Sequence, residues 1–142
     1  TIAFINGNGT TTEPQAYSFT DEKVSVGSYT YRLKQVDFDG TFEYSNAVEA
    51  DVLAPSSFVL EQNYPNPFNP STTIKFSLPY ETEVRLSVYN TIGEKVAEVF
   101  NGNLKEGYHE VVFEAASLTS GTYFYRLEAN EFVDVKKMLI LK

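Results

Sequence analysis

Residues 60–70 read Leu-Glu-Gln-Asn-Tyr-Pro-Asn-Pro-Phe-Asn-Pro, and this stretch decides how the rest of the chain is divided. Pro65, Pro67 and Pro70 cannot lie inside a helix or a central strand, because proline has no backbone N–H to donate. Each proline also pushes the preceding residue toward extended geometry. We therefore predict a stiff, extended segment at the entrance to a separate domain, anchored by the apolar side chains of Tyr64 and Phe68.

Apolar and polar residues alternate after this segment, as in Ile74, Phe76 and Leu78 with Lys75 and Ser77 between them. A period of two is typical of antiparallel strands with one buried face. The pattern predicts strands at residues 58–62, 72–78, 83–89, 95–100, 108–114, 121–129 and 132–141. Turns are expected at 90–93, 101–107, 117–121 and 130–131, and residues 115–119 could form a single helical turn. Seven short strands at roughly ten-residue spacing predict a small immunoglobulin-like β-sandwich.

The chain before this domain forms a second block of strand-forming sequence. Small residues and Pro55 predict a linker at 54–57, between a domain at 1–53 and a domain at 58–142. Strands are expected at 2–5, 16–20, 28–37 and 41–51, with a hairpin turn at Asp39-Gly40, since both residues tolerate positive φ.

The predicted fold class is therefore all-β, with two consecutive immunoglobulin-like antiparallel β-sandwiches. About 50 residues provide four strands where such a sandwich usually has seven, so the first domain is expected to be incomplete. Its missing strands would lie upstream or come from another chain. Open sheet edges of this kind allow self-association.

Composition narrows the class of protein. The chain has 142 residues, 42% hydrophobic and 15% aromatic, which is enough apolar material for a core. Its net charge of −8 offers no basic stripe for nucleic acid, and no apolar run approaches the length of a membrane span. There is no cysteine, which excludes disulfides and thiol chemistry. The first residues lack the basic region of a signal peptide, so we expect them to come from inside a longer polypeptide.

Five motifs in residues 58–142 resemble a type A C-terminal sorting domain of the type IX secretion system, the export machinery of certain Gram-negative bacteria. They lie at 60–70, 72–76, 88–93, 118–127 and 136–142, in the order of that family. Glu131 departs from the pattern, because the family often has a turn glycine there. The resemblance places the sorting-signal motif at Pro65, Asn66, Pro67, Phe68, Asn69, Pro70, Gly93, Gly121, Tyr123, Lys136 and Lys137.

This resemblance implies a function without catalysis or cofactors. The domain would fold in the periplasm and be recognised by the outer-membrane translocon, so the protein would be secreted or held at the cell surface. A sortase-like peptidase would remove the domain in many family members and join the remainder to surface lipopolysaccharide. A cut between residues 53 and 57 is expected from the exposure of the linker. Residues 1–53 resemble the C-terminal half of a fibronectin type III or immunoglobulin-like module, mainly through 31–40.

Several motifs that suggest a chemical site have simpler explanations. Residues 37–43, Asp-Phe-Asp-Gly-Thr-Phe-Glu, lack ligands that a calcium loop requires, so a plain hairpin turn is favoured. His109 is the single histidine and has no nucleophile motif to serve, which favours a surface strand position. Asn8-Gly9-Thr10 matches a glycosylation sequon by chance. The acidic residues are interpreted as solvated loop charges: Glu13, Asp21, Glu22, Asp37, Asp39 and Glu43.

Three alternatives stay open at this point. Tyr29, Tyr31, Tyr123 and Tyr125 are best explained by packing, although they could form a carbohydrate platform on a polysaccharide-binding module. Lys136 and Lys137 either protect an edge strand or form part of the surface that the translocon contacts. The protein could also be a structural subunit that exchanges strands between copies.

Overall fold

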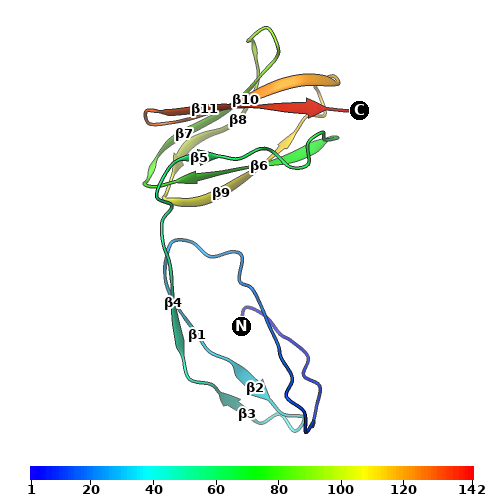
Figure 1. The fold of residues 1–142 in the computed structure, drawn as a ribbon, viewed down its shortest axis with the longest axis vertical. Coiled ribbons are helices and arrows are strands. Elements are labelled where there is room, and N and C mark those ends of the chain that lie inside the picture. The colour runs from blue at the N-terminus through cyan, green and yellow to red at the C-terminus, as the bar shows by residue number, and fades with distance from the viewer.

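The computed structural model describes residues 1–142 as an all-β chain in two regions, one on each side of the predicted linker (Figure 1). The strands are β1 Gly27–Tyr31, β2 Lys34–Val36, β3 Phe42–Tyr44, β4 Val48–Val52, β5 Val59–Leu60, β6 Ser71–Leu78, β7 Thr82–Tyr89, β8 Lys95–Leu104, β9 Gly107–Glu114, β10 Gly121–Ala129 and β11 Phe132–Ile140. No helix long and apolar enough to cross a membrane is present. The all-β prediction is confirmed.

The seven strands after the linker form a two-layered sandwich. One sheet has the order β11-β10-β7-β8 and the other has the order β5-β6-β9, with every neighbouring pair antiparallel. In Figure 1 the three-stranded sheet lies between the four-stranded sheet and the first region of the chain. The loop between β5 and β6, residues 61–70, is called the proline segment below. It passes along the side of the sandwich where β5 and β11 lie.

The core is built from the alternation that the sequence shows. Phe76 in β6 and Leu86 in β7 are buried, as are the residues two positions away on either side of each. Phe113 in β9 is also buried, whereas its neighbour Val112 is 62% exposed. These face assignments are confirmed. Burying a large apolar side chain contributes about 1.5–3 kcal/mol, so the cluster of sixteen buried residues, all but Ala115 and Ala129 with larger side chains, provides the main stabilisation of the sandwich.

Two turn boundaries differ from the prediction. The turn expected at 101–107 is confined to 105–106, because β8 continues to Leu104 and pairs with Thr82 at the start of β7. Strand β5 is only two residues long where five were expected, because the chain enters the proline segment directly after it. The single turn expected near 115–119 is present, with Leu118 N donating to Ala115 O at 3.0 Å.

The first region contains two separate two-stranded ladders, β1 with β4 and β2 with β3. The predicted strands at 2–5 and 16–20 are wrong, since no strand forms there. The long strands expected at 28–37 and 41–51 are each interrupted. Leu33 and Ser45 connect the two chain segments where the strands are interrupted. Leu33 N donates to Ser45 Oγ at 2.8 Å, and Ser45 N donates to Leu33 O at 2.9 Å.

No residue of 1–53 is buried, although the region is rich in aromatic side chains. Its aromatic contacts are local and lie within each ladder. The rings of Tyr29 and Tyr31 stack at 6.3 Å, and the Arg32 guanidinium lies 3.9 Å from the centre of the Tyr44 ring. Phe38, at the tip of the β2–β3 hairpin, is 98% exposed. The ladders therefore form without a shared core.

Candidate functional site

The proline segment connects the two sheets of the sandwich. Near its start, Tyr64 bridges Thr73 in β6, with Tyr64 N donating to Thr73 O at 3.0 Å and Thr73 N donating to Tyr64 O at 2.9 Å. Near its end, Phe68 pairs in parallel with β11. Phe68 N donates to Leu139 O at 3.1 Å, and Leu141 N donates to Phe68 O at 3.1 Å. The segment is thus a backbone tie between β6 and the last strand.

The expectation of a fully extended proline segment is wrong. The chain bends at 65–67 and again at 69–70, and the peptide bonds before Pro65, Pro67 and Pro70 are cis. Only one of the two expected anchors is inside. Phe68 is 3% exposed and packs against the ring of Phe113 at 6.3 Å, whereas Tyr64 is 81% exposed. The bends follow from the path of the segment, which must carry Phe68 from the edge of one sheet into the core.

A buried polar cluster at Asn63 holds the start of the segment. Asn63 N donates to the Tyr125 hydroxyl at 2.8 Å, and that hydroxyl donates to Glu61 O at 2.7 Å. Asn63 Nδ2 donates to Thr72 Oγ1 at 3.0 Å, and Thr72 Oγ1 donates to Pro65 O at 2.8 Å. Buried polar groups are costly unless paired, so this cluster fixes the geometry of the segment against β6 and β10.

Burial raises the pKa of Tyr125 to about 12. The hydrogen bond from the backbone of Asn63 opposes this shift, and the negative charge of Asp134 adds to it. The phenol therefore stays neutral at physiological pH and can both donate and accept a hydrogen bond. Its role is to hold the proline segment, and the carbohydrate platform considered from the sequence is wrong for this residue, which is fully buried.

Two side chains of the proline segment cover part of the outer edge of β11. Asn66 Oδ1 accepts a hydrogen bond from Leu139 N at 2.9 Å. Gln62 Nε2 donates to Lys137 O at 2.7 Å. Together with the Phe68 backbone, they satisfy the outward-facing groups of β11 from Lys137 O to Leu141 N. An edge strand with satisfied backbone groups is a poor template for further strands.

The two lysines of β11 point to opposite faces of the sheet. Lys136 is half-buried on the face that also carries the buried Met138, and it lies opposite Tyr125 in β10. Lys137 is exposed on the outer face, opposite Phe124. An inward-pointing charge on an edge strand is a common protection against strand addition. Lys137 is the one of the pair that a partner on the outer face would contact.

The remaining predicted motif residues fall into two groups. Gly121 and Tyr123 lie in β10 opposite Ile140 and Met138, close to where Phe68 joins β11. Tyr123 is buried, and its hydroxyl donates to Thr119 O at 3.1 Å. Gly93 is separate, in the β7–β8 turn, where its φ of 85° is one that other residues rarely adopt. Asn69 and Pro70 complete the bend that leads into β6.

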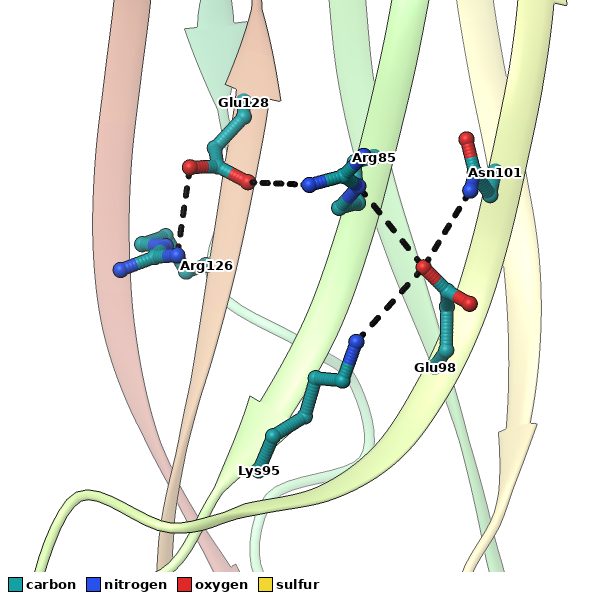
Figure 2. A network of polar contacts seen from close by, with 6 residues as sticks. All are labelled: Arg85, Lys95, Glu98, Asn101, Arg126 and Glu128. Carbon is teal, nitrogen blue, oxygen red and sulfur yellow. Dashed lines mark hydrogen bonds and ion pairs between the residues drawn. The ribbon is translucent and has the colours of Figure 1, made fainter.

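A charged network on the outer face of the four-stranded sheet was not predicted from the sequence (Figure 2). Arg85 lies between Glu98 and Glu128, at 3.7 Å and 4.0 Å, and Arg126 contacts Glu128 at 3.2 Å. The network comprises Arg85, Lys95, Glu98, Asn101, Arg126 and Glu128. Opposite charges at alternate positions of neighbouring strands were the available signal. Exposed ion pairs contribute little to stability, so the main effect of the network is on the charge distribution of this face.

A shallow hollow of about 300 Å³ lies beside this network. Its lining includes Tyr89, Phe124, Arg126, Val135 and the β7–β8 turn. The Arg126 guanidinium lies 4.9 Å from the centre of the Tyr89 ring. Arg126 Nε in β10 and the Ser87 hydroxyl in β7 lie opposite each other on adjacent strands, and both are buried without a hydrogen-bond partner. The rings of Tyr89 and Phe124 and the guanidinium group of Arg126 therefore lie close to Val135 in the edge strand β11.

The other chemical motifs do not assemble into a site. Gly40 N donates to Asp37 O at 3.0 Å in a hairpin turn, as predicted, and the side-chain hydrogen bond from Thr41 lowers the pKa of Asp39. His109 is half-buried in β9 and stacks on Phe76 at 5.6 Å. The chain contains no group of three or more His, Cys, Asp or Glu residues that could hold a metal ion.

Comparison with known proteins identifies the second region. The family described as secretion system C-terminal sorting domain matches residues 62–141, which is more than half of the chain. The match begins within the proline segment and ends directly after β11. No curated protein matches the chain.

Proposed function

The chain belongs to the secretion system C-terminal sorting domain family, and we propose that its sandwich is the folded signal by which the type IX machinery recognises the protein for export. The observation that carries the proposal is the match at 62–141, which includes residues 62–70 of the proline segment and the strand to which that segment is bonded. A rigid surface suits recognition, because a receptor need not order it on binding. The proposal gives the domain no catalytic role and no cofactor.

The proposed contact surface is the outer side of the last strand, with Lys137 and the neighbouring proline segment. Both elements belong to the resemblance motif, and the hydrogen bond from Gln62 to Lys137 O places them together. The exported protein would then be released or anchored at the cell surface of a Gram-negative bacterium.

Export of variants tests this function. Deleting residues 136–142 should leave the protein in the periplasm, and normal export of this deletion would overturn the sorting function. The deletion also removes Met138 and Ile140 from the core, so a milder variant is needed. Lys137→Glu reverses an exposed charge and should reduce export while the melting temperature is kept. Lys105→Glu, in the exposed β8–β9 turn, is the matched control. Equal export of these two variants would show that Lys137 in the last strand is not part of the contact surface.

Processing by a sortase-like peptidase is a further part of the proposal. Leu53 is 77% exposed, and residues 56–57 are also exposed, although Pro55 between them is buried. These flanking positions favour a cut at one side of Pro55. The intact mass of the extracellular protein would show whether the sandwich is removed and where. A mass that retains all residues to 142 would contradict processing.

A structural subunit is the second candidate function. Residues 1–53 form two ladders with open edges and no buried residue, and such edges can accept strands from another chain. The resemblance of this region to half of a fibronectin type III or immunoglobulin-like module gives the same expectation. Filaments seen by electron microscopy would support this candidate. A monomer at all concentrations would count against it.

A further inference from the structure

The first half of β11 has an uncovered outer edge. Backbone groups of alternate residues, starting at Val133, face away from β10, as the outward bonds of Lys137 O, Leu139 N and Leu141 N show. The proline segment covers this edge only from Lys137 O onward. Before that point, Val135 N donates only to the carboxylate oxygen Oδ1 of the preceding Asp134, at 2.8 Å, and no strand lies beyond β11 in the sheet.

The inward-pointing charges of this half-strand discourage the addition of strands that cannot neutralise them. Val133 and Val135 are 55% and 48% exposed on the outer face. Asp134 and Lys136 face the other sheet and are half-buried. Two charges of the same sign would repel the same strand from another copy. The charges of Asp134 and Lys136 are instead opposite in sign and lie two residues apart on one face. Their effect depends on what the incoming strand carries.

A second copy of the same strand carries the complementary pattern. In an antiparallel pair centred on Val135, each Asp134 lies directly opposite Lys136 of the other copy. Val133 then lies opposite Lys137, whose aliphatic stem can cover the valine while its ammonium group stays in water. We propose that two copies of this chain associate through residues 133–137 of β11 and join their four-stranded sheets into one continuous sheet. This proposal does not depend on the sorting function.

The surroundings of the edge are compatible with this pairing. Val135 is also in the lining of the hollow that contains Tyr89 and Arg126, so the outer face beside the new strand is open. In Figure 1 β11 lies in the layer farthest from the first region, so residues 1–53 do not cover this edge. Gln62 already occupies Lys137 O, which limits the pairing to about five residues. Interfaces this small are weak, so we expect dimers at protein concentrations on the order of 0.1–1 mM.

Sedimentation of the full 142-residue chain tests the proposal. The wild type should show a concentration-dependent dimer. Val135→Pro should be monomeric, because it removes the central N–H at a position where an edge strand tolerates proline. A wild type that stays monomeric at about 1 mM would overturn the proposal. Equal association of Val135→Pro would also overturn it and would place the contact elsewhere, for example on the open ladders of the first region.

Charge reversal provides a control that does not depend on proline. Asp134→Lys places only lysines on the inner side of the paired edge, and Lys136→Asp places only aspartates there. Each variant alone should dimerise roughly tenfold more weakly than the wild type, because like charges directly opposite each other are destabilising. An equimolar mixture should form a heterodimer near wild-type affinity, because the two lysines of one variant would then face the two aspartates of the other. Melting temperatures show whether each variant is folded. Folded variants whose mixture fails to associate would contradict the proposed pairing.

Discussion

The regions before and after the linker have similar strand-forming sequences but different packing. Every buried residue of the chain lies at or after Pro55, and sixteen of them form one apolar cluster. Residues 1–53 contain exposed side chains such as Phe4, Phe38 and Leu33 and form only two short ladders. The difference shows that aromatic and β-branched residues form only short ladders where no second layer covers them. We therefore expect the second region to hold nearly all of the stability.

The largest expected effect comes from the core of the second region. Phe76→Ala removes a side chain that is 2% exposed, so the free energy of unfolding should fall by about 3–5 kcal/mol. Phe38→Ala is the control in the first region, where the side chain is 98% exposed and no loss is expected. Urea denaturation followed by circular dichroism measures both. A similar loss in the two variants would mean that the first region has a core of its own.

A smaller effect is expected from the polar cluster under the proline segment. Tyr125→Phe removes the hydroxyl that accepts from Asn63 N and donates to Glu61 O. Leaving these buried groups unpaired should cost about 1–3 kcal/mol. Hydrogen exchange should show faster exchange at Asn63 and Phe68, while the amides of β7 stay protected. Unchanged exchange at both residues would show that the Tyr125 hydroxyl does not stabilise the proline segment that connects the two sheets.

The same tyrosine predicts a loss of stability at high pH. Its pKa in the folded state is raised to about 12, above the value near 10 expected when unfolded. The neutral phenol thus contributes stability that is fully present below about pH 10 and is lost as the pH rises through about 12. Melting temperatures between about pH 9 and pH 12 should fall more steeply for the wild type than for Tyr125→Phe. Parallel curves would contradict the raised pKa.

The smallest expected effect concerns the charged network on the outer face. Arg85→Ala removes two contacts of an arginine whose side chain is 54% exposed. Its exposure limits the expected cost to about 0–1 kcal/mol, and salt should reduce the cost further. Thermal unfolding at low and high salt measures it. A loss as large as that of Phe76→Ala would show that the network is part of the stabilising structure.

Much of the second region could be predicted from its sequence because its signal is local and periodic. Alternation around Phe76 and Leu86 assigned the buried faces correctly. In the first region, the hairpin turn at Asp39-Gly40 was also predicted correctly, because its signal is local too. The predicted strands at 2–5 and 16–20 failed, since strand propensity alone does not specify a pairing partner where no second layer covers the strand.

The site was harder to predict, because it depends on residues far apart in the chain. Phe68 was correctly expected to be an anchor, but Tyr64 was not distinguishable from it by composition. The cluster of Asn63, Thr72 and Tyr125 joins three elements and has no local sequence signal. The same holds for the cover that Gln62 and Asn66 give to β11.

Transfer of the sandwich to an unrelated periplasmic protein tests the central claim most directly. Residues 58–142 fused to the C-terminus of a reporter should carry it out of a bacterium that has the type IX machinery. Residues 1–57 fused in the same way should leave the reporter in the periplasm. Export of both fusions, or of neither, would contradict the assignment of the sorting signal to the second region.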